Sequence, residues 1–548
     1  MRKGFKILGA SIAGCVHIAG VLNFLNIAKD EGFDTKFCGS ALEIDQFLNE
    51  VKIFKPDIIG VSYRLSPESA VVVFKEFLEK LKDYLVNEDV ILTLGTTKSV
   101  EAALAKADLL KYFNKVFTGG EDKKEVLNFL KGQKLKSYKK NIPPQKLMER
   151  IDYKKPFPLL RHHFGRPDFE ETLKGIKKIA KSGVIDVISL GPDQNTQEFF
   201  FNPDKMKKSL DGAGGVPIRS KDDFRKLYEA SRRGNFPLMR CYSGTNNIIK
   251  FAEVLYETIN NAWCAVPLCW YNEIDNRSER KLEEAIKENQ EVMKWHAIRK
   301  IPVEVNESHH WSLRYAPDSI AVTAAYLAAY NAKKMGVKEY VSQYMFNTPP
   351  ETNFKMDIAK MLAKVELIES LHDENFKSIR ETRTGLFSMS SNLNKNKGQL
   401  ASSTFLQMQL KPQIVHVVAA CESEYAARPD DIIESTFIVI RVIENILNGA
   451  PDILIDDEIK NRKKDLIEEA KLIINKIKSL DFKNKFSDPL IEPTIISEAI
   501  RKGVLDAPHL KNVPIAKGDI ITGFINGACV ALDRDGNILK ESERLKNL

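Results

Sequence analysis

The chain has 548 residues, of which 43% are hydrophobic and 28% charged, and this describes a globular protein of two or three domains rather than one core. No apolar run reaches the ~18 residues that cross a bilayer, and seven cysteines without a CxxC pair exclude a disulfide scaffold and fit a reducing cytoplasm. The formal net charge of +8 comes from lysines mixed with glutamates on predicted helical faces, so we expect neither a nucleic-acid nor a membrane partner.

Residues 1–132 alternate between short apolar segments and longer amphipathic ones. Strands are predicted at KILGASIAG (6–14), DTKFCG (34–39), PDIIGVSY (56–63), DVILTLGT (89–96) and KVFTGG (115–120), each followed by a segment of helical periodicity. The basic start and its apolar run resemble a signal peptide, but a buried first strand explains these residues better. The strict alternation predicts a doubly wound, flavodoxin-like (Rossmann-type) α/β domain.

The rest of the chain divides into three further segments. Residues 133–160 are rich in lysine and proline and indicate a linker. Residues 161–450 resume the β/α rhythm with longer units, and long amphipathic helices separate most of the predicted strands, which lie at 184–190, 237–242, 265–270, 302–307, 339–346, 384–391 and 414–420. This rhythm predicts a (β/α)8 TIM barrel. Residues 451–548 predict a charged helix and then a hairpin with a DG turn at 535–536, packed on the barrel.

Three loops that follow predicted strands of the first domain carry a spaced set of residues. Cys15, His17 and Gly20 form C-x-H-x-x-G after the first strand, Ser62 follows the third strand and Gly95 the fourth. The carboxyl ends of strands are where an open α/β sheet binds its ligands. An imidazole can ligate a metal, and a glycine lets a ligand approach the backbone closely. The alternative is that His17 is an ordinary loop histidine in a doubly wound sheet.

These residues resemble the cobalamin-binding modules of glutamate mutase, methylmalonyl-CoA mutase and methionine synthase, which carry D-x-H-x-x-G, S-x-L and G-G. The resemblance implies that His17 binds the cobalt of cobalamin from below, while the nucleotide tail enters a slot beside the serine and the glycines. Cys15 stands where the family has aspartate, and Thr96 where it has the second glycine. The implied cofactor-binding residues are Cys15, His17, Gly20, Ser62, Leu65, Gly95, Thr96, Gly119 and Gly120.

Residues 160–515 resemble the large subunit of glutamate mutase (methylaspartate mutase) in a series of ordered segments. The matching segments include SGVIDVISLGPDQNTQ, NFPLMRCYSGTNN, PVEVNESHHW, IVHVVAACESEYAARPD and GVLDAPHL. The resemblance implies an adenosylcobalamin-dependent carbon-skeleton mutase, an isomerase, with its small cobalamin-binding subunit fused ahead of the large one. It also implies radical chemistry at the barrel strand ends and a homodimer through the barrel.

The residues that bind glutamate in that family are mostly replaced here. Two of its arginines fall on Gln197 and Tyr242, the third has only an approximate counterpart in Arg166 or His163, and its amine-binding glutamate falls on Cys264. Because a dicarboxylate needs fixed bidentate cations, we expect a small acid other than glutamate. The candidate catalytic residues are Arg240, Tyr242, Glu307 and Tyr344, and the candidate substrate-binding residues are Arg166, Gln197, Trp270, Tyr271, Asn306 and His309. The family's lysine that touches the adenosyl group falls on Ala420, and its partner glutamate is kept as Glu424, a candidate cofactor-binding residue.

Several alternatives stay open. The N-E-S-H-H segment of residues 306–310 could hold a metal, although adjacent histidines point in different directions, or it could be a plain loop. A corrinoid-dependent methyltransferase would need a methyl-donor site and usually a helical cap ahead of the corrinoid domain, whereas this sequence opens on the first predicted strand. A cobalamin carrier or sensor would have no need of a complete barrel.

Overall fold

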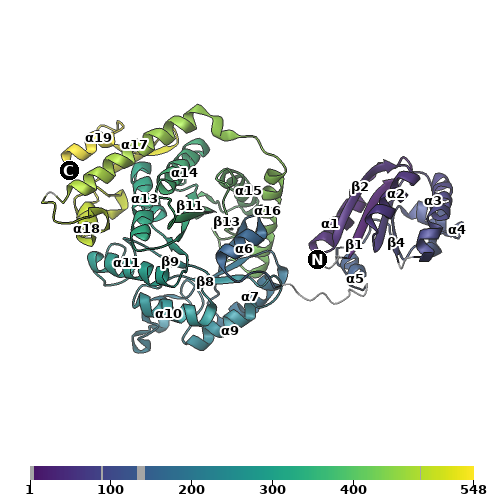
Figure 1. The fold of residues 1–548 in the computed structure, drawn as a ribbon, viewed down its shortest axis with the longest axis horizontal. Coiled ribbons are helices and arrows are strands. Elements are labelled where there is room, and N and C mark those ends of the chain that lie inside the picture. The colour runs from purple at the N-terminus through teal and green to yellow at the C-terminus, as the bar shows by residue number, and fades with distance from the viewer. Residues whose placement is uncertain (1–4, 88–89, 122, 133–141, 482) are drawn as a thin grey trace. The chain divides into compact units, whose positions relative to one another are not determined.

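The computed structural model describes the chain except for residues 1–4, 88–89, 122, 133–141 and 482 (Figure 1). The chain divides into two compact units, Met1–Asn141 and Ile142–Leu548. The first part of the expected linker, 133–141, lies outside the described residues. Its remainder belongs to the second unit, where it forms helix α6 (Leu147–Lys154) and the start of strand β6 (Leu159–Phe164).

The first unit contains a five-stranded parallel sheet of order β2-β1-β3-β4-β5. Its strands are β1 (Lys6–Ile12), β2 (Asp34–Leu42), β3 (Ile58–Ser62), β4 (Ile91–Gly95) and β5 (Lys115–Phe117), and its helices are α1 (Ala19–Asp30), α2 (Ile44–Phe54), α3 (Pro67–Asn87), α4 (Lys98–Lys106) and α5 (Lys123–Gly132). Each predicted strand and helix of this unit is therefore present. The strand order reverses between β1 and β3, which defines a switch point at the carboxyl edge of the sheet.

Helices cover both faces of this sheet. Phe24 of α1 and Val126 of α5 belong to the apolar core on one face. Phe47 of α2, Phe74 of α3 and Leu104 of α4 belong to the core on the other face. Burying one such phenylalanine contributes roughly 1.5–3 kcal/mol, so the two cores fix the sheet between its helical layers.

The second unit contains a nearly closed barrel of eight parallel strands. These are β6, β7 (Val187–Leu190), β8 (Leu238–Cys241), β9 (Cys264–Val266), β10 (Val303–Val305), β11 (Glu339–Phe346), β12 (Lys377–Thr384) and β13 (Ile414–His416), paired in the order β8-β7-β6-β13-β12-β11-β10-β9. The ladder is open only between β8 and β9, where the Ala262 N–H donates to the Met239 carbonyl (2.9 Å) and the Ser243 N–H donates to the Ala265 carbonyl (3.1 Å). The predicted barrel architecture is thus observed.

The barrel helices form an outer ring around the strands (Figure 1). They are α7 (Phe169–Ser182), α9 (Lys221–Ser231), α10 (Ile248–Ile259), α11 (Leu282–Ile298), α13 (Asp318–Lys334), α14 (Phe354–Glu369), α15 (Leu393–Met408) and α16 (Pro429–Leu447). Two short helices, α8 (Gln194–Phe199) and α12 (Ser308–Ser312), lie in the loops after β7 and β10. No helix in the described part of the chain combines the length and apolarity that a membrane crossing needs.

Two barrel strands differ from the sequence prediction. The strand predicted at 384–391 is wrong: the strand is β12, which ends at Thr384, and Leu386–Ser388 is a 3-10 turn. The reason is the sequence of β12, KSIRETRT, whose alternating charges indicate a solvent-exposed segment, whereas Glu381 is fully buried inside the barrel. Strand β6, LLRHHF, was likewise not predicted, and it also carries charge into the interior.

The C-terminal segment forms helices α17 (Asp457–Ser479), α18 (Pro493–Arg501) and α19 (Glu541–Arg544) and an antiparallel hairpin of β14 (Ile521–Ile525) and β15 (Ala528–Leu532). Helix α17 packs on α13 and α14. The hairpin turns at Asn526 and Gly527, and the predicted DG turn follows it, where the Leu539 N–H donates to the Ala531 carbonyl (2.9 Å). This segment therefore adds a layer outside one side of the barrel.

Candidate functional site

The loop between β1 and α1 holds His17 at the carboxyl edge of the first unit's sheet. The Ser62 hydroxyl donates to the His17 carbonyl (2.8 Å), and the His17 ring places Nδ1 3.6 Å from the Cys15 sulfur. The Arg64 N–H donates to the same sulfur (3.3 Å). Cys15 is fully buried while His17 is exposed. Among the described residues nothing bonds to His17 Nε2, so this nitrogen is available to a ligand.

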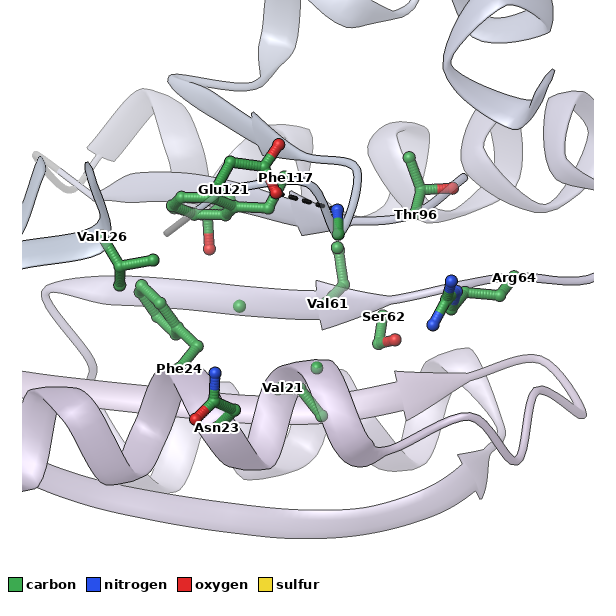
Figure 2. A pocket seen from close by; sticks show the side chains of 15 residues that line it. Val21, Asn23, Phe24, Val61, Ser62, Arg64, Thr96, Phe117, Glu121 and Val126 are labelled. Atoms are coloured by element: carbon green, nitrogen blue, oxygen red, sulfur yellow. Dashed lines mark hydrogen bonds between the residues drawn. The ribbon is translucent and has the colours of Figure 1, made fainter. Parts of the chain in front are cut away.

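A cavity opens beside this loop, over β3, β4 and β5 and along α1 (Figure 2). Its volume is about 180 Å³, below the roughly 300–1,000 Å³ of pockets that enclose a whole drug-sized ligand, so it can take only part of a large ligand. The predicted residues that line it are Gly20, Ser62, Gly95, Thr96 and Gly119. A Cβ built on Gly20 or Gly119 would meet no atom within 4 Å, so these glycines leave open room.

The cavity has one apolar wall and one polar rim. Phe24 projects from α1 and Phe117 lies opposite on β5, while Arg64 stands at the end beyond β3 (Figure 2). The Glu121 carboxylate accepts the N–H groups of Thr118 (2.7 Å) and Gly119 (2.8 Å). Burial opposes the charged form, but these backbone donors hold the pKa of Glu121 below its ordinary value. Sequence reasoning missed Arg64 and Glu121, because their role depends on where the loops fold.

Two predicted cofactor residues of the first unit lie apart from this arrangement. Leu65 is 40% exposed on the loop after β3, and Gly120 is outside the cavity lining. Glu424 belongs to the second unit, where it is exposed on the loop after β13.

The amino end of the barrel interior is closed by apolar side chains. Leu159, Val187, Leu238, Val341, Ile379 and Ile414 point inward there and pack with Leu147 and Ile151 of α6. Helix α6 therefore plugs this end of the barrel, and the chemistry-bearing residues lie above the plug, toward the carboxyl ends of the strands.

A fully buried charged layer lies above the plug. Arg161 Nη1 is 2.8 Å from Glu381 and 3.4 Å from Glu304, and Arg240 Nη1 is 3.3 Å from Glu304. The Trp263 indole N–H (2.7 Å) and the Gln343 amide (2.8 Å) also donate to Glu304. Burial raises the pKa of Glu381 to about 7 in spite of Arg161. Such a network is most stable when all its polar atoms are satisfied. Glu304 accepts from four groups, whereas Arg161 Nε and Arg240 Nη2 have no hydrogen-bond partner among the described residues.

Two histidines and a tyrosine lie on the next layer. Arg161 Nη2 donates to His163 Nε2 (2.9 Å) and to His416 Nδ1 (3.1 Å), and the Tyr242 hydroxyl is 3.0 Å from His163 Nε2. An arginine can only donate, so these imidazole nitrogens are acceptors and the rings are neutral. Burial, with Arg161 next, holds the pKa of both histidines well below the ordinary value.

Arg383 enters the same layer from β12. It lies two residues beyond Glu381 and therefore on the same, inward face of the strand. Its Nε donates to the Thr384 carbonyl (3.4 Å), and no described carboxylate pairs with its guanidinium. Its charge helps to lower the pKa of His163, His416, His309 and His310 after the larger effect of burial. Arg383 is thus a cation among neutral imidazoles.

The loops after β9 and β10 form an aromatic rim. Glu307 accepts the N–H groups of Leu268 and Cys269 and the Trp311 indole N–H, each at 2.9 Å. Trp270 packs against Trp311, with ring centroids 5.0 Å apart, and is fully buried. Glu307 therefore holds the two loops together, although its burial raises its own pKa.

The structure brings some predicted barrel residues together and separates others. Arg240 and Tyr242 share the interior, and Trp270, Tyr271, Asn306, Glu307 and His309 form the rim next to it. Tyr344 faces outward into the helical layer with Ile358. Arg166 donates to the Ala426 carbonyl (2.9 Å), and Gln197 lines a separate polar cavity with Thr245, Asn276 and Arg277.

Sequence reasoning missed the charged interior set, Arg161, Glu304, Glu381, Arg383 and His416. The available signal was period-two spacing of charge within short segments that are otherwise strand-like, as in R-E-T-R of β12. The metal alternative for residues 306–310 gains no support, since no group of three metal-ligating side chains lies close together in the described ranges.

No family model matches the chain, and no curated protein matches it. Among solved structures, a cobalamin-binding protein from Desulfitobacterium hafniense DCB-2 is similar over 24% of this chain and 58% of its own, with 21% identity and a TM-score of 0.20. The chain thus spans 58% of that protein's length. OxsB, a cobalamin-dependent S-adenosylmethionine radical enzyme, is similar over 92% of this chain and 76% of its own, with 11% identity and a TM-score of 0.19. Likenesses this low carry no argument about the fold or activity of this chain.

Proposed function

We propose that this protein is an adenosylcobalamin-dependent mutase that acts on a small acid. Its first unit would bind the corrinoid with His17 as the lower ligand of cobalt, as a flavodoxin-like domain can at its switch point, and its barrel would bind the substrate. One observation carries the proposal: His17, fixed at its ring and its carbonyl, stands beside a glycine-lined cavity at the carboxyl edge of a doubly wound sheet.

The residues around His17 in the first unit fit a corrinoid. A metal-binding histidine needs one free nitrogen and a partner that orients the other; His17 offers Nε2, while Cys15 lies at Nδ1. The cavity is lined by Gly20, Ser62 and Gly119, which leave room for a buried nucleotide tail. Phe24 and Phe117 offer it an apolar wall.

The barrel supplies binding and orientation. The Arg161, Glu304 and Glu381 network is buried beneath the interior histidines and fixes the rings of His163 and His416. The rim residues Trp270 and Trp311 exclude water from the carboxyl end. Adenosylcobalamin, when bound, supplies the radical chemistry itself. The chain's own residues hold the substrate and keep solvent away from it.

The first test is corrinoid uptake by the full chain under anaerobic conditions. We expect wild type to bind adenosylcobalamin with a visible spectrum that shows histidine in place of the benzimidazole base. His17→Ala should lose that spectrum, whereas His509→Ala, an exposed histidine of the second unit, should keep it. A purified chain that takes up no corrinoid, or an unchanged spectrum in His17→Ala, contradicts the proposal.

The second test identifies the reaction. The loaded protein is mixed anaerobically with candidate acids and examined by electron paramagnetic resonance. A mutase should give a cob(II)alamin signal only with a true substrate. Cycling through cob(I)alamin with a methyl donor would instead favour a corrinoid-dependent methyltransferase and would overturn the mutase assignment.

A further inference from the structure

We propose that the substrate carries a single carboxylate, which Arg383 anchors inside the barrel, and that the rest of the molecule is uncharged. This inference rests on the proposed function, because it takes the barrel interior as the place where an acid binds. It goes beyond that function by assigning the anchoring residue and the charge of the ligand.

The deeper cations are already paired. Arg161 and Arg240 face Glu304 and Glu381 at 2.8 to 3.4 Å, with all four side chains fully buried. Arg240 also donates through Nε to the Ser189 hydroxyl (3.2 Å). Each guanidinium of this layer already has a carboxylate partner, although the raised pKa of Glu381 leaves the layer partly cationic near neutral pH. Their shared network also fixes them too firmly to reorient toward one.

The rim cations are also engaged. Arg277 and Arg314 each lie 3.8 Å from Asp275. The Arg314 guanidinium stands 4.0 Å above the Trp270 ring and that of Arg277 stands 4.5 Å above the Tyr271 ring. Cation–π contacts and a nearby carboxylate hold both groups at the rim, where Arg277 lines the polar cavity beside Gln197 rather than the barrel interior.

Arg383 is the remaining inward-facing cation of the described barrel strands. Arg383 lowers the pKa of two carboxyl groups, Glu381 and Glu422. Glu381 is already paired with Arg161. Glu422 lies 2.9 Å from His162 and accepts the Ala419 N–H (2.7 Å). A half-buried guanidinium without a carboxylate partner is costly to desolvate. A ligand carboxylate would satisfy it through a bidentate pair.

The imidazole rings around Arg383 are uncharged. His163, His309, His310 and His416 all have pKa values held well below the ordinary one, chiefly by burial. These rings offer hydrogen bonds but no charge. A second carboxylate on the ligand would therefore meet neutral rings in a partly buried site and lose part of its hydration without a compensating charge. The site thus favours a monocarboxylate over a dicarboxylate.

The test uses three probes of one chain length on the full, corrinoid-free protein: pentanoate, glutarate and pentanamide. Isothermal titration calorimetry should give the tightest binding for pentanoate. Arg383→Gln should weaken pentanoate binding by roughly 10- to 100-fold, the range of a lost charge-assisted bond, and should abolish its advantage over pentanamide. Arg441→Gln, an exposed residue paired with Glu444 on α16, is the matched control and should bind like wild type.

Arg383→Lys keeps the inference testable where Arg383→Gln fails to fold, as judged by circular dichroism. It retains the charge without the bidentate geometry, so pentanoate should bind more weakly than to wild type yet still better than pentanamide. Tighter binding of glutarate than of pentanoate, no binding of any probe by wild type, or unchanged pentanoate binding in a folded Arg383 variant would overturn the inference. Corrinoid uptake measured with His17→Ala is independent of these titrations, so failure of the proposed cofactor and failure of the anchor are distinguishable.

Discussion

Cys15 occupies the position beside His17 that an aspartate holds in the cobalamin modules that the sequence resembles. For Nε2 to bind a metal, Nδ1 must carry the ring hydrogen and donate it to the Cys15 sulfur, 3.6 Å away. That sulfur already accepts the Arg64 N–H at 3.3 Å, and sulfur is a weak acceptor. The thiol therefore orients the ring less firmly than a carboxylate would.

Replacing Cys15 by aspartate should strengthen ligation by His17. A carboxylate accepts the Nδ1 hydrogen in a charge-assisted bond, and partners of metal-binding histidines change metal affinity by roughly 10- to 100-fold. We expect Cys15→Asp to bind adenosylcobalamin more tightly, measured by titration of the visible spectrum. Cys38→Ser, a change to a half-buried cysteine of β2, is the control. Equal affinity of Cys15→Asp and wild type would show that Cys15 does not position the ring.

At the level of single residues, spacing along the sequence located the first site better than the second. Cys15, His17 and Ser62 were predicted because each follows a strand whose apolar run is easy to detect, and the structure places them in contact. Arg161 and Arg383 were missed because charged side chains are almost always exposed. Only the closed barrel turns alternate residues of β6 and β12 into a buried polar interior.

Strand β10 and its neighbours illustrate how an element can depend on a buried charge. Glu304 accepts from Arg161, Arg240, Trp263 and Gln343, which come from four other parts of the barrel wall. Breaking a buried ion network by removing one partner leaves uncompensated charges and destabilises by roughly 3–5 kcal/mol.

We therefore expect Glu304→Gln to lower the free energy of unfolding by about 3–5 kcal/mol, because two guanidinium groups lose their shared carboxylate. Urea denaturation followed by circular dichroism measures this. Glu458→Gln, which removes an exposed pair with Lys355, should change the free energy by no more than ~1 kcal/mol. Similar small losses in both variants would mean that the buried network does not stabilise the barrel.

Helix α11 carries a buried histidine that should make its stability depend on pH. His296 is 2% exposed, and its Nδ1–H donates to the Val292 carbonyl (2.8 Å). Burial lowers the pKa of His296 to about 4 from the ordinary 6.5. Between these pH values the unfolded chain binds the proton and the folded chain does not, so stability from this group is full above pH 6.5 and falls as the pH drops toward 4.

Over that window the loss from His296 is on the order of 3 kcal/mol. His296→Gln keeps a donor but cannot titrate, so its free energy of unfolding should fall less steeply than that of wild type between pH 6.5 and 4. Urea unfolding at several pH values measures the two slopes, with His509→Gln, an exposed site, as control. Parallel slopes for wild type and His296→Gln would show that the buried ring does not resist protonation.

Across the whole molecule, the sequence predicted two α/β architectures in the right order, because strand–helix alternation is a strong and repeated signal. The boundary was harder to predict. Residues 147–154 lie in a segment that is rich in lysine and proline, yet Leu147 and Ile151 of α6 are buried against the barrel floor. A short amphipathic helix in such a segment has too few turns for its period to stand out.

Each unit encloses its own cores, and this predicts that the two fold independently. Val21 and Phe24 on one face of the first sheet and Phe47 and Phe74 on the other are buried within residues 5–132, and compact domains with complete cores fold alone. Residues 1–141 expressed separately should give a dispersed amide spectrum by nuclear magnetic resonance and should bind adenosylcobalamin. Residues 142–548 should keep pentanoate binding while binding no corrinoid. Calorimetry of the full chain should then resolve two transitions, each matching one fragment.

An unfolded first fragment would mean that this unit depends on the barrel for its stability. Corrinoid uptake by the second fragment alone would place the cofactor site outside the first unit.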